Sequence, residues 1–197
     1  MLTLHRAALL QADPAATAPP LAEGAVLVRG DRVAALGPFA ELAAAHPTAR
    51  VRDWGAGRLV PGLVQPYGHL LLEGRYHPDP REELGELPLA LPPAGVDEAH
   101  YGGRGGSARR GLQRMLAHGT TALAGPFEHP AVRTAVSRSG LLVLAAPPAA
   151  PPFDGTFAAL PGGALAAEGR ADLAVLAVAD GRCLATVLGG RLLHRAR

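Results

Sequence analysis

The chain of 197 residues has a single cysteine and a single tryptophan, and it contains no lysine, asparagine or isoleucine. One cysteine, Cys183, excludes an internal disulfide and a zinc site built from several thiolates. Without lysine, the basic side chain of a nucleotide-binding P-loop is also absent. Aromatic residues form 4% of the chain and hydrophobic residues 48%, so the core must consist mainly of Leu, Val and Ala.

Long apolar runs are absent too, since no segment reaches the ~18 residues that span a membrane. The apolar N-terminal stretch is interrupted by His5 and Arg6, which does not suit a signal peptide. The net charge is only +2, and the arginines form no dense stripe of the kind that binds nucleic acid. We therefore expect a cytoplasmic protein that binds neither nucleic acid nor membrane.

Both ends of the chain show strand patterns. Residues 25–37 predict a hairpin, because two apolar runs flank Gly30 and Asp31, which suit a tight reversal. Further strand candidates lie at both ends, in residues 1–11, 49–54, 171–178 and 184–194. A short helix over 41–46 should end at Pro47.

The middle of the chain alternates strands and helices. Strands are predicted for 58–64, 120–124 and 141–146, the last of a buried type, and helices for 107–118 and 130–139. Ser107 is the expected N-cap of the first helix. This order predicts parallel strands joined by right-handed crossovers. Residues 74–106 show little pattern and indicate a long excursion.

Two stretches in this middle part resemble a known family. Residues 59–70, LVPGLVQPYGHL, resemble the first barrel strand of amidohydrolases, typically VPGLVDxHxHL. Pro66 and the following LLEGR at 71–75 resemble imidazolonepropionase in particular. GGRGG at 102–106, with a helix ending in MLAHGTT at 115–121, is similar to that family's glycine-rich helix and second strand.

The C-terminal part carries the resemblance further. Residues 163–175 look like the family's closing segment, and 189–193 like its final strand. The resemblance implies an α/β plus β fold, with a composite β-sandwich domain from both chain ends (1–58 and 161–197). Between them, 59–160 would form a truncated TIM-barrel-like segment of about three strands, where the family's barrel has eight.

The same resemblance implies a metal site that is incomplete here. Amidohydrolases bind zinc or iron through a His-x-His pair on strand one, two later histidines and an aspartate. In this chain Tyr67 stands in place of the first histidine and Gln65 in place of the preceding aspartate, so only His69 remains. A catalytic zinc needs about three protein ligands and an open position. We expect no bound metal, with zinc or iron as the alternative.

Other residues could serve a rebuilt site. Glu128 and His129 follow the second middle strand, at the end where barrel sites lie, and could join His69 on a metal, although two solvated loop side chains are the simpler interpretation. Arg75 lies near the place where imidazolonepropionase holds a substrate carboxylate, and Tyr67 is a weaker substrate-binding candidate. The 102–106 loop could hold an anion, or simply connect two elements.

Two functions remain open. The first is a metal-dependent hydrolase of carbon–nitrogen bonds other than peptide bonds, acting on a cyclic amide or amidine-like molecule. The second is a non-catalytic pseudoenzyme that binds a small metabolite or a partner protein. A half barrel leaves open strand edges and an apolar face, so both hypotheses predict a homo-oligomer or a protein partner, unless a local rearrangement covers them.

Overall fold

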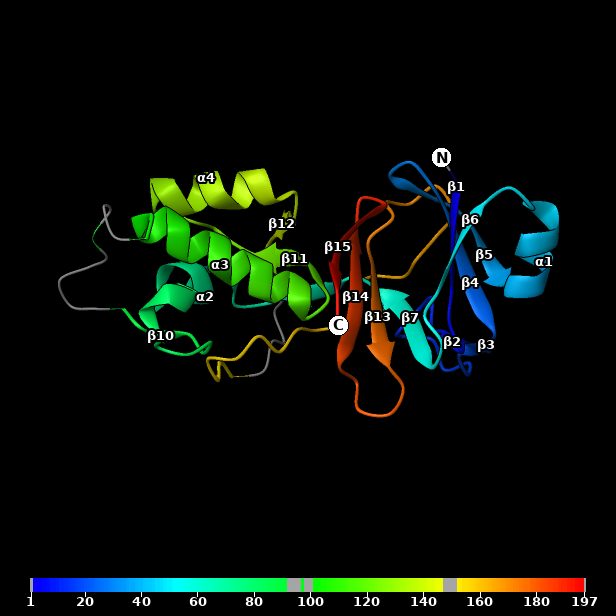
Figure 1. The fold of residues 1–197 in the computed structure, drawn as a ribbon, viewed down its shortest axis with the longest axis horizontal. Helices are drawn as coiled ribbons and strands as arrows, with labels where there is room; N and C mark the ends of the chain where they lie inside the picture. The colour runs from blue at the N-terminus through cyan, green and yellow to red at the C-terminus, as the bar shows by residue number, and fades with distance from the viewer. Residues whose placement is uncertain (1, 92–96, 98–100, 147–151, 197) are drawn as a thin grey trace.

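The computed structural model describes residues 2–91, 97, 101–146 and 152–196. Figure 1 shows a β-rich half that contains both chain ends and a second half in which helices cover a small sheet. Mixed sheets and helices are therefore the fold class, and the described residues form no closed barrel. None of their helices combines the length and apolarity that crossing a membrane requires.

The first sheet has four strands, and its order follows from one hairpin and one crossover. Its strands, in sheet order, are β5 (Arg32–Pro38), β4 (Gly24–Arg29), β1 (Leu2–Arg6) and β6 (Arg50–Asp53). The predicted 25–37 hairpin is confirmed, with Gly30 at φ +61° in the turn. Helix α1 (Phe39–Ala45) follows β5 and ends before Pro47, as the sequence predicts.

The second sheet has six strands and joins the two chain ends. Its strands, in sheet order, are β15 (Arg191–Arg195), β14 (Cys183–Leu188), β13 (Leu173–Ala177), β7 (Gly57–Pro61), β2 (Leu9–Leu10) and β3 (Leu21–Ala22). The junction is the antiparallel pair of β13 with β7. Side chains from both sheets, such as Val26 and Leu173, meet in one buried core.

The third sheet is parallel and lies in the helical half. Strands β12 (Leu142–Leu144), β11 (Thr120–Ala124) and β8 (Leu63–Gln65) lie side by side in that order. Helices α3 (Gly103–Ala117) and α4 (Pro130–Ser139) connect them, which confirms the predicted alternation of strands and helices. The remaining elements are α2 (Gly68–Glu73), β9 (Arg75–Tyr76), the short 3-10 helix η1 (Pro80–Glu82) and β10 (Leu89–Ala90).

Four local predictions are corrected. The single run at 58–64 is two strands in different sheets, separated at Gly62, where a Cβ would stand 2.0 Å from the Thr121 hydroxyl oxygen. The run at 184–194 is likewise two strands, separated by a glycine pair. The 141–146 strand is not buried, because β12 is a sheet edge and Val143 is 52% exposed.

The fourth correction concerns the start of α3. The helix begins at Gly103, not at Ser107, and its N-cap is Gly102 at φ +77°. Glycines inside this first turn disfavour a helix by propensity, but a Cβ on Gly106 would stand 2.2 Å from the Tyr101 carbonyl oxygen. Close packing of the backbone therefore selects glycine here. Ser107 is buried instead of capping, and its hydroxyl accepts the His77 N–H at 2.9 Å.

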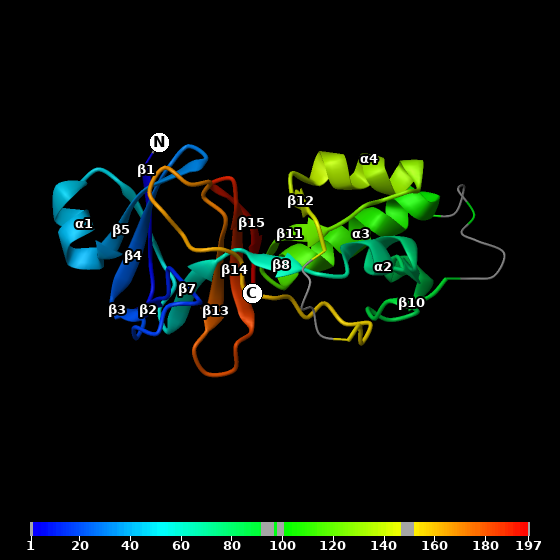
Figure 2. The same ribbon diagram turned by 180° about the vertical axis from the view of Figure 1, so that it is seen from behind.

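One edge of the parallel sheet is covered by the chain itself. Val64 in β8 and Leu160 exchange backbone hydrogen bonds of 2.9 and 2.8 Å in an antiparallel bridge. Figure 2 shows the segment after residue 152, in yellow, passing beside β8 and α2. At the β8 edge the chain itself thus supplies the cover that was one of the two alternatives, whereas β12 has no second neighbour among the described strands.

Candidate functional site

The predicted metal ligand His69 lies on a helix, not on a strand. Strand β8 ends at Gln65, Tyr67 is the N-cap of α2, and His69 is in the first turn of that helix. The strand alternation that places two histidines on one face therefore does not operate here. His69 is half-buried, and its Nδ1 is buried without a hydrogen-bond partner in the described structure.

Gln65, in place of the family's aspartate, connects two segments. Its side chain is fully buried, donates to the Ala158 carbonyl oxygen at 3.0 Å and accepts the Tyr67 N–H at 3.0 Å. An aspartate or glutamate could accept the second bond but, when ionised, could not donate the first. The amide thus fixes residue 158 against the end of β8.

Glu128 and His129 are held in place through their backbone N–H groups, both of which bind Glu73. The carboxylate of Glu73, at the end of α2, accepts both of their N–H groups at 2.7 Å. His129 is the N-cap of α4, where its Nδ1 accepts the Ala131 N–H at 3.3 Å. Glu128 is exposed. Within the described ranges, no three His, Cys, Asp or Glu side chains gather as metal ligands, and His100 lies outside those ranges.

Two phenylalanines of residues 152–160 pack against aromatic and basic side chains that follow β8 or lie at the end of α3. Phe153 packs against the Tyr67 ring at 5.2 Å and lies under the Arg75 guanidinium at 5.7 Å. Phe157 is buried, with the His77 ring at 5.7 Å and the His118 ring at 5.3 Å. We call residues 152–160 the aromatic segment. It contacts two predicted site residues, Tyr67 and Arg75, that the sequence analysis assigned to substrate.

A hollow of about 370 Å³ opens beside the aromatic segment. Arg75, His118, Asp154 and Phe157 are among its lining residues. Apart from its cation–π contact with Phe153, the guanidinium of the half-buried Arg75 has no hydrogen-bond or ion-pair partner in the described structure. Burial lowers the pKa of His118, with His194 adding to the effect, so the imidazole is neutral at pH 7. The net result is a free guanidinium at a small-molecule-sized hollow.

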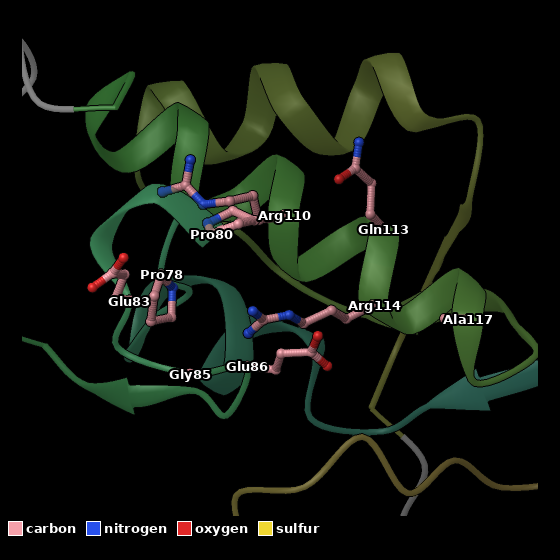
Figure 3. Close-up of a pocket in the computed structure, with 9 residues that line it drawn as sticks. All are labelled: Pro78, Pro80, Glu83, Gly85, Glu86, Arg110, Gln113, Arg114 and Ala117. Atoms are coloured by element: carbon pink, nitrogen blue, oxygen red, sulfur yellow. The ribbon is translucent and has the colours of Figure 1, made fainter.

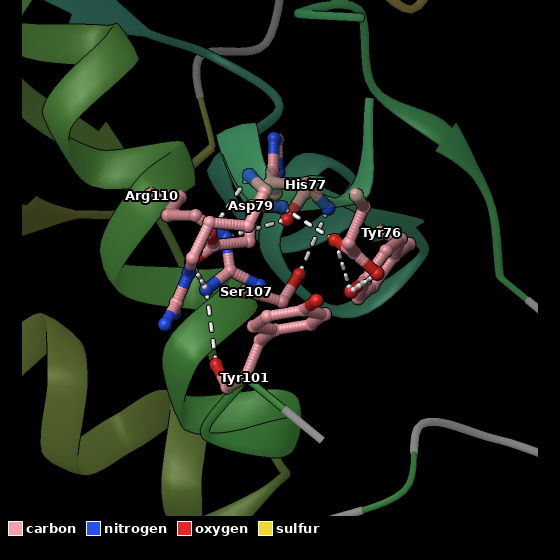
Figure 4. Close-up of polar contacts among 8 residues, drawn as sticks. Tyr76, His77, Asp79, Tyr101, Ser107 and Arg110 are labelled. Atoms are coloured by element: carbon pink, nitrogen blue, oxygen red, sulfur yellow. Dashed lines mark hydrogen bonds and ion pairs between the residues drawn. The ribbon is translucent and has the colours of Figure 1, made fainter. Parts of the chain in front are cut away.

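A polar network under α3 was missed by the sequence analysis. Arg110 donates to the carbonyl oxygens of His77 at 2.8 Å and Tyr101 at 3.0 Å, and its guanidinium lies 3.5 Å from the Asp79 carboxylate (Figure 4). Burial lowers the pKa of His77 to about 4. Hydrogen bonds from Arg81 lower the pKa of Asp79 to about 2. The only sequence signal was Asp-Pro-Arg-Glu at 79–82, a capping box around η1.

A second hollow, of about 570 Å³, adjoins this network. Figure 3 shows Arg110 and Arg114 of α3 on one side and Glu83 and Glu86 on the other, with Arg114 beside Glu86. Opposite charges thus face each other within the lining. This hollow carries no excess charge that would select an anion or a cation.

The comparisons with known proteins agree with the predicted resemblance. Residues 24–49, comprising β4, β5 and α1, match the family model described as imidazolonepropionase-like composite domain, bacteria. The match confirms the resemblance to amidohydrolases. The matched segment resembles imidazolonepropionase in particular. It lies outside every sequence motif from which the resemblance was first inferred. A search of curated protein sequences gives no match.

Three solved structures that match part of this chain belong to longer proteins. Helicobacter pylori aminofutalosine deaminase is 12% identical, with a TM-score of 0.46 over 73% of this chain and 32% of that one. A. niger ochratoxinase is 17% identical, with a TM-score of 0.48 over 73% and 31%. Guanine deaminase from Bradyrhizobium japonicum is 20% identical, with a TM-score of 0.44 over 73% and 34%. The aligned region thus corresponds to about a third of each of these proteins.

Proposed function

We propose that this protein is a non-catalytic, amidohydrolase-like protein that binds a small carboxylate at Arg75. In this proposal residues 1–58 and 161–197 are the composite β-sandwich domain, and 59–160 are the truncated barrel segment. The observation that carries it is the aromatic segment, because Phe153 packs against Tyr67 and Arg75, the two residues that the resemblance assigns to substrate binding. A cytoplasmic location remains a prediction.

The residues present do not fit the metal that the family resemblance implies. A catalytic zinc or iron site needs about three protein ligands. His69 is the one ligand left of the family's motif, and the described residues bring no second and third ligand to it. Tyr67, in place of the other histidine, packs on Phe153. We therefore derive no hydrolytic step for this chain.

Arg75 supplies the chemistry for the proposed ligand. A guanidinium binds a carboxylate through two parallel N–H bonds, and such pairs are stronger when partly shielded from water. Phe153 beneath the guanidinium limits its motion, and the neutral His118 and the apolar Phe157 suit an uncharged ring or chain. A small molecule with one carboxylate and a flat body fits this combination.

The test is isothermal titration calorimetry with 3-(imidazol-4-yl)propionate and with its methyl ester, which lacks the carboxylate charge. The proposal predicts that the acid binds and the ester does not, and that Arg75→Gln weakens acid binding by about tenfold, or ~1.4 kcal/mol. Arg182→Gln, at an exposed turn of the other half, is the matched control. Equal affinity of Arg75→Gln and the parent protein across a panel of small carboxylates would refute the proposal.

One observation favours the rival function, a hydrolase with a rebuilt metal site. The buried Nδ1 of His69 lacks a hydrogen-bond partner in the described structure, as a metal-ligating nitrogen would before loading. The two functions differ in metal content, because a rebuilt site would hold about one metal ion per chain and the non-catalytic protein would hold none. Self-association also remains a proposal, supported by the exposed β12 edge, and light scattering at high dilution would reveal a monomer if it is wrong.

A further inference from the structure

The outer faces of α3 and α4 enclose a groove of about 460 Å³. The two helices lie next to each other over the parallel sheet (Figure 1). Leu112 and Leu116 of α3 and Ala131 and Ala135 of α4 form its apolar lining. These residues recur at helical spacing, so the apolar strip follows both helices rather than one point.

Two arginines give this groove a charge that its lining does not neutralise. Arg109 of α3 and Arg138 of α4 line it, and none of the other described residues in the lining is acidic. Both arginine side chains are exposed, and neither guanidinium has a hydrogen-bond or ion-pair partner among the described residues. The first turn of α3 also contains no acidic residue, so nothing there offsets the positive charge.

The position of Arg109 depends on the glycines at the start of α3. Its Nη2 lies 3.0 Å from the point at which a Cβ on Gly102 would stand, and its Nη1 lies 3.7 Å from the equivalent point on Gly105. Any larger residue at 102 would displace the guanidinium. The glycine-rich stretch 102–106, which the sequence alone left open as a connecting loop, therefore forms the backbone surface against which the Arg109 guanidinium packs.

The other two hollows lack this combination. The hollow beside Arg114 contains Glu83 and Glu86. The hollow beside Arg75 has one arginine and Asp154, whose carboxylate accepts two hydrogen bonds from Thr156 and forms no ion pair with Arg75 in the described structure. In the α3–α4 groove, by contrast, the described lining residues combine an apolar strip with two arginines and no acidic side chain. Charge complementarity selects a negative head group, and the lining selects an apolar body. The volume falls within the ~300–1,000 Å³ of small-molecule sites.

We propose that the α3–α4 groove binds an amphiphilic monoanion, a single carboxylate or sulfonate attached to an aliphatic or aromatic body. The acid group pairs with the Arg109 guanidinium, which lies beside Gly105, and the body lies along the apolar strip toward Leu112 and Ala135. This site is separate from the Arg75 hollow, so the two proposals stand or fall independently.

The experiment compares two fluorescent probes of similar shape, the anion 1-anilinonaphthalene-8-sulfonate and the uncharged N-phenyl-1-naphthylamine. The variant Arg109→Gln/Arg138→Gln is expected to weaken binding of the sulfonate by about tenfold and to leave the neutral probe unchanged, because only the anion uses the guanidinium groups. Arg29→Gln, an exposed arginine at the end of β4, is the matched control and leaves both affinities unchanged.

A second variant tests the apolar lining. Ala131→Leu extends a half-buried side chain into the groove and should weaken binding of both probes, while far-UV circular dichroism shows that the helices are intact. Decanoate should displace the sulfonate probe, and 1-decanol should do so less well. The proposal is overturned if the double arginine variant binds the sulfonate as tightly as the parent does, or if Ala131→Leu binds both probes as tightly as the parent does.

Discussion

Protonation of two buried histidines is expected to destabilise the protein in mild acid. His77 is completely buried and His5 nearly so. Burial lowers the pKa of each from 6.5 to about 4, with arginines nearby adding to the effect. The His77 Nε2 bonds to the Leu71 carbonyl oxygen at 2.8 Å, while its Nδ1 is buried without a partner. A proton on that Nδ1 would therefore be a buried charge without an acceptor.

The size and sign of the effect follow from the two pKa values. Between pH 6.5 and 4 the unfolded chain holds more protons than the folded one, so the free energy of unfolding decreases as the pH falls. At pH 4.5 the loss relative to pH 7.5 amounts to about 2.5 kcal/mol for each histidine, at 1.36 kcal/mol per pKa unit. Two such losses are a large part of the ~5–15 kcal/mol that stabilises a typical domain.

Urea denaturation followed by far-UV circular dichroism, at several values between pH 7.5 and 4.5, measures this loss. Fluorescence is unsuitable because the only tryptophan, Trp54, donates its Nε1–H to His5 Nδ1 at 3.3 Å and would report the titration itself. His77→Gln keeps a donor for the Leu71 carbonyl and removes the titration, so it should lose about 2.5 kcal/mol less than the parent. His46→Gln is the control. An equal pH dependence of His77→Gln and the parent would refute the reasoning.

Three further predictions use the same denaturation assay at pH 7.5. Phe157→Ala removes the ring between His77 and His118 and should cost ~3–5 kcal/mol; a loss below 1 kcal/mol would mean that the aromatic segment does not pack as described. Gln65→Glu places a carboxylate against the Ala158 carbonyl oxygen and should cost about 3 kcal/mol, with part of the loss restored at pH 4; an unchanged stability would contradict the buried amide bond. Glu73→Ala should cost about 1 kcal/mol and shift the Glu128 and His129 amide signals in NMR spectra, while unmoved signals would exclude the two bonds.

Much of the fold was predictable because it depends on local signals. The β4–β5 hairpin follows from a two-residue turn between apolar runs, and α4 from Pro130 at its start and Gly140 beyond its end. The errors arose where tertiary contacts override local pattern. Gly62 divides an apolar run because Thr121 leaves no room for a side chain there. Similarly, β12 has the composition of a buried strand but lies at an edge.

The candidate site was less predictable. The family resemblance indicated Arg75 and His69, but the sequence could not show that β8 ends before His69 or that α2 follows at once. The aromatic segment gave no advance signal, because two phenylalanines in a proline-rich stretch resemble a linker; residues 147–151 of that stretch lie outside the described structure. Its contacts with Tyr67 and Arg75 join positions far apart in the sequence.

Metal content tests the central claim most directly. The protein would be purified without chelators, beside His69→Ala, and bound zinc and iron would be measured by plasma mass spectrometry. The account predicts far less than one equivalent in both samples, because the described residues bring no three ligands together. Near one equivalent in the parent protein, lost in His69→Ala, would contradict it and establish a rebuilt metal site.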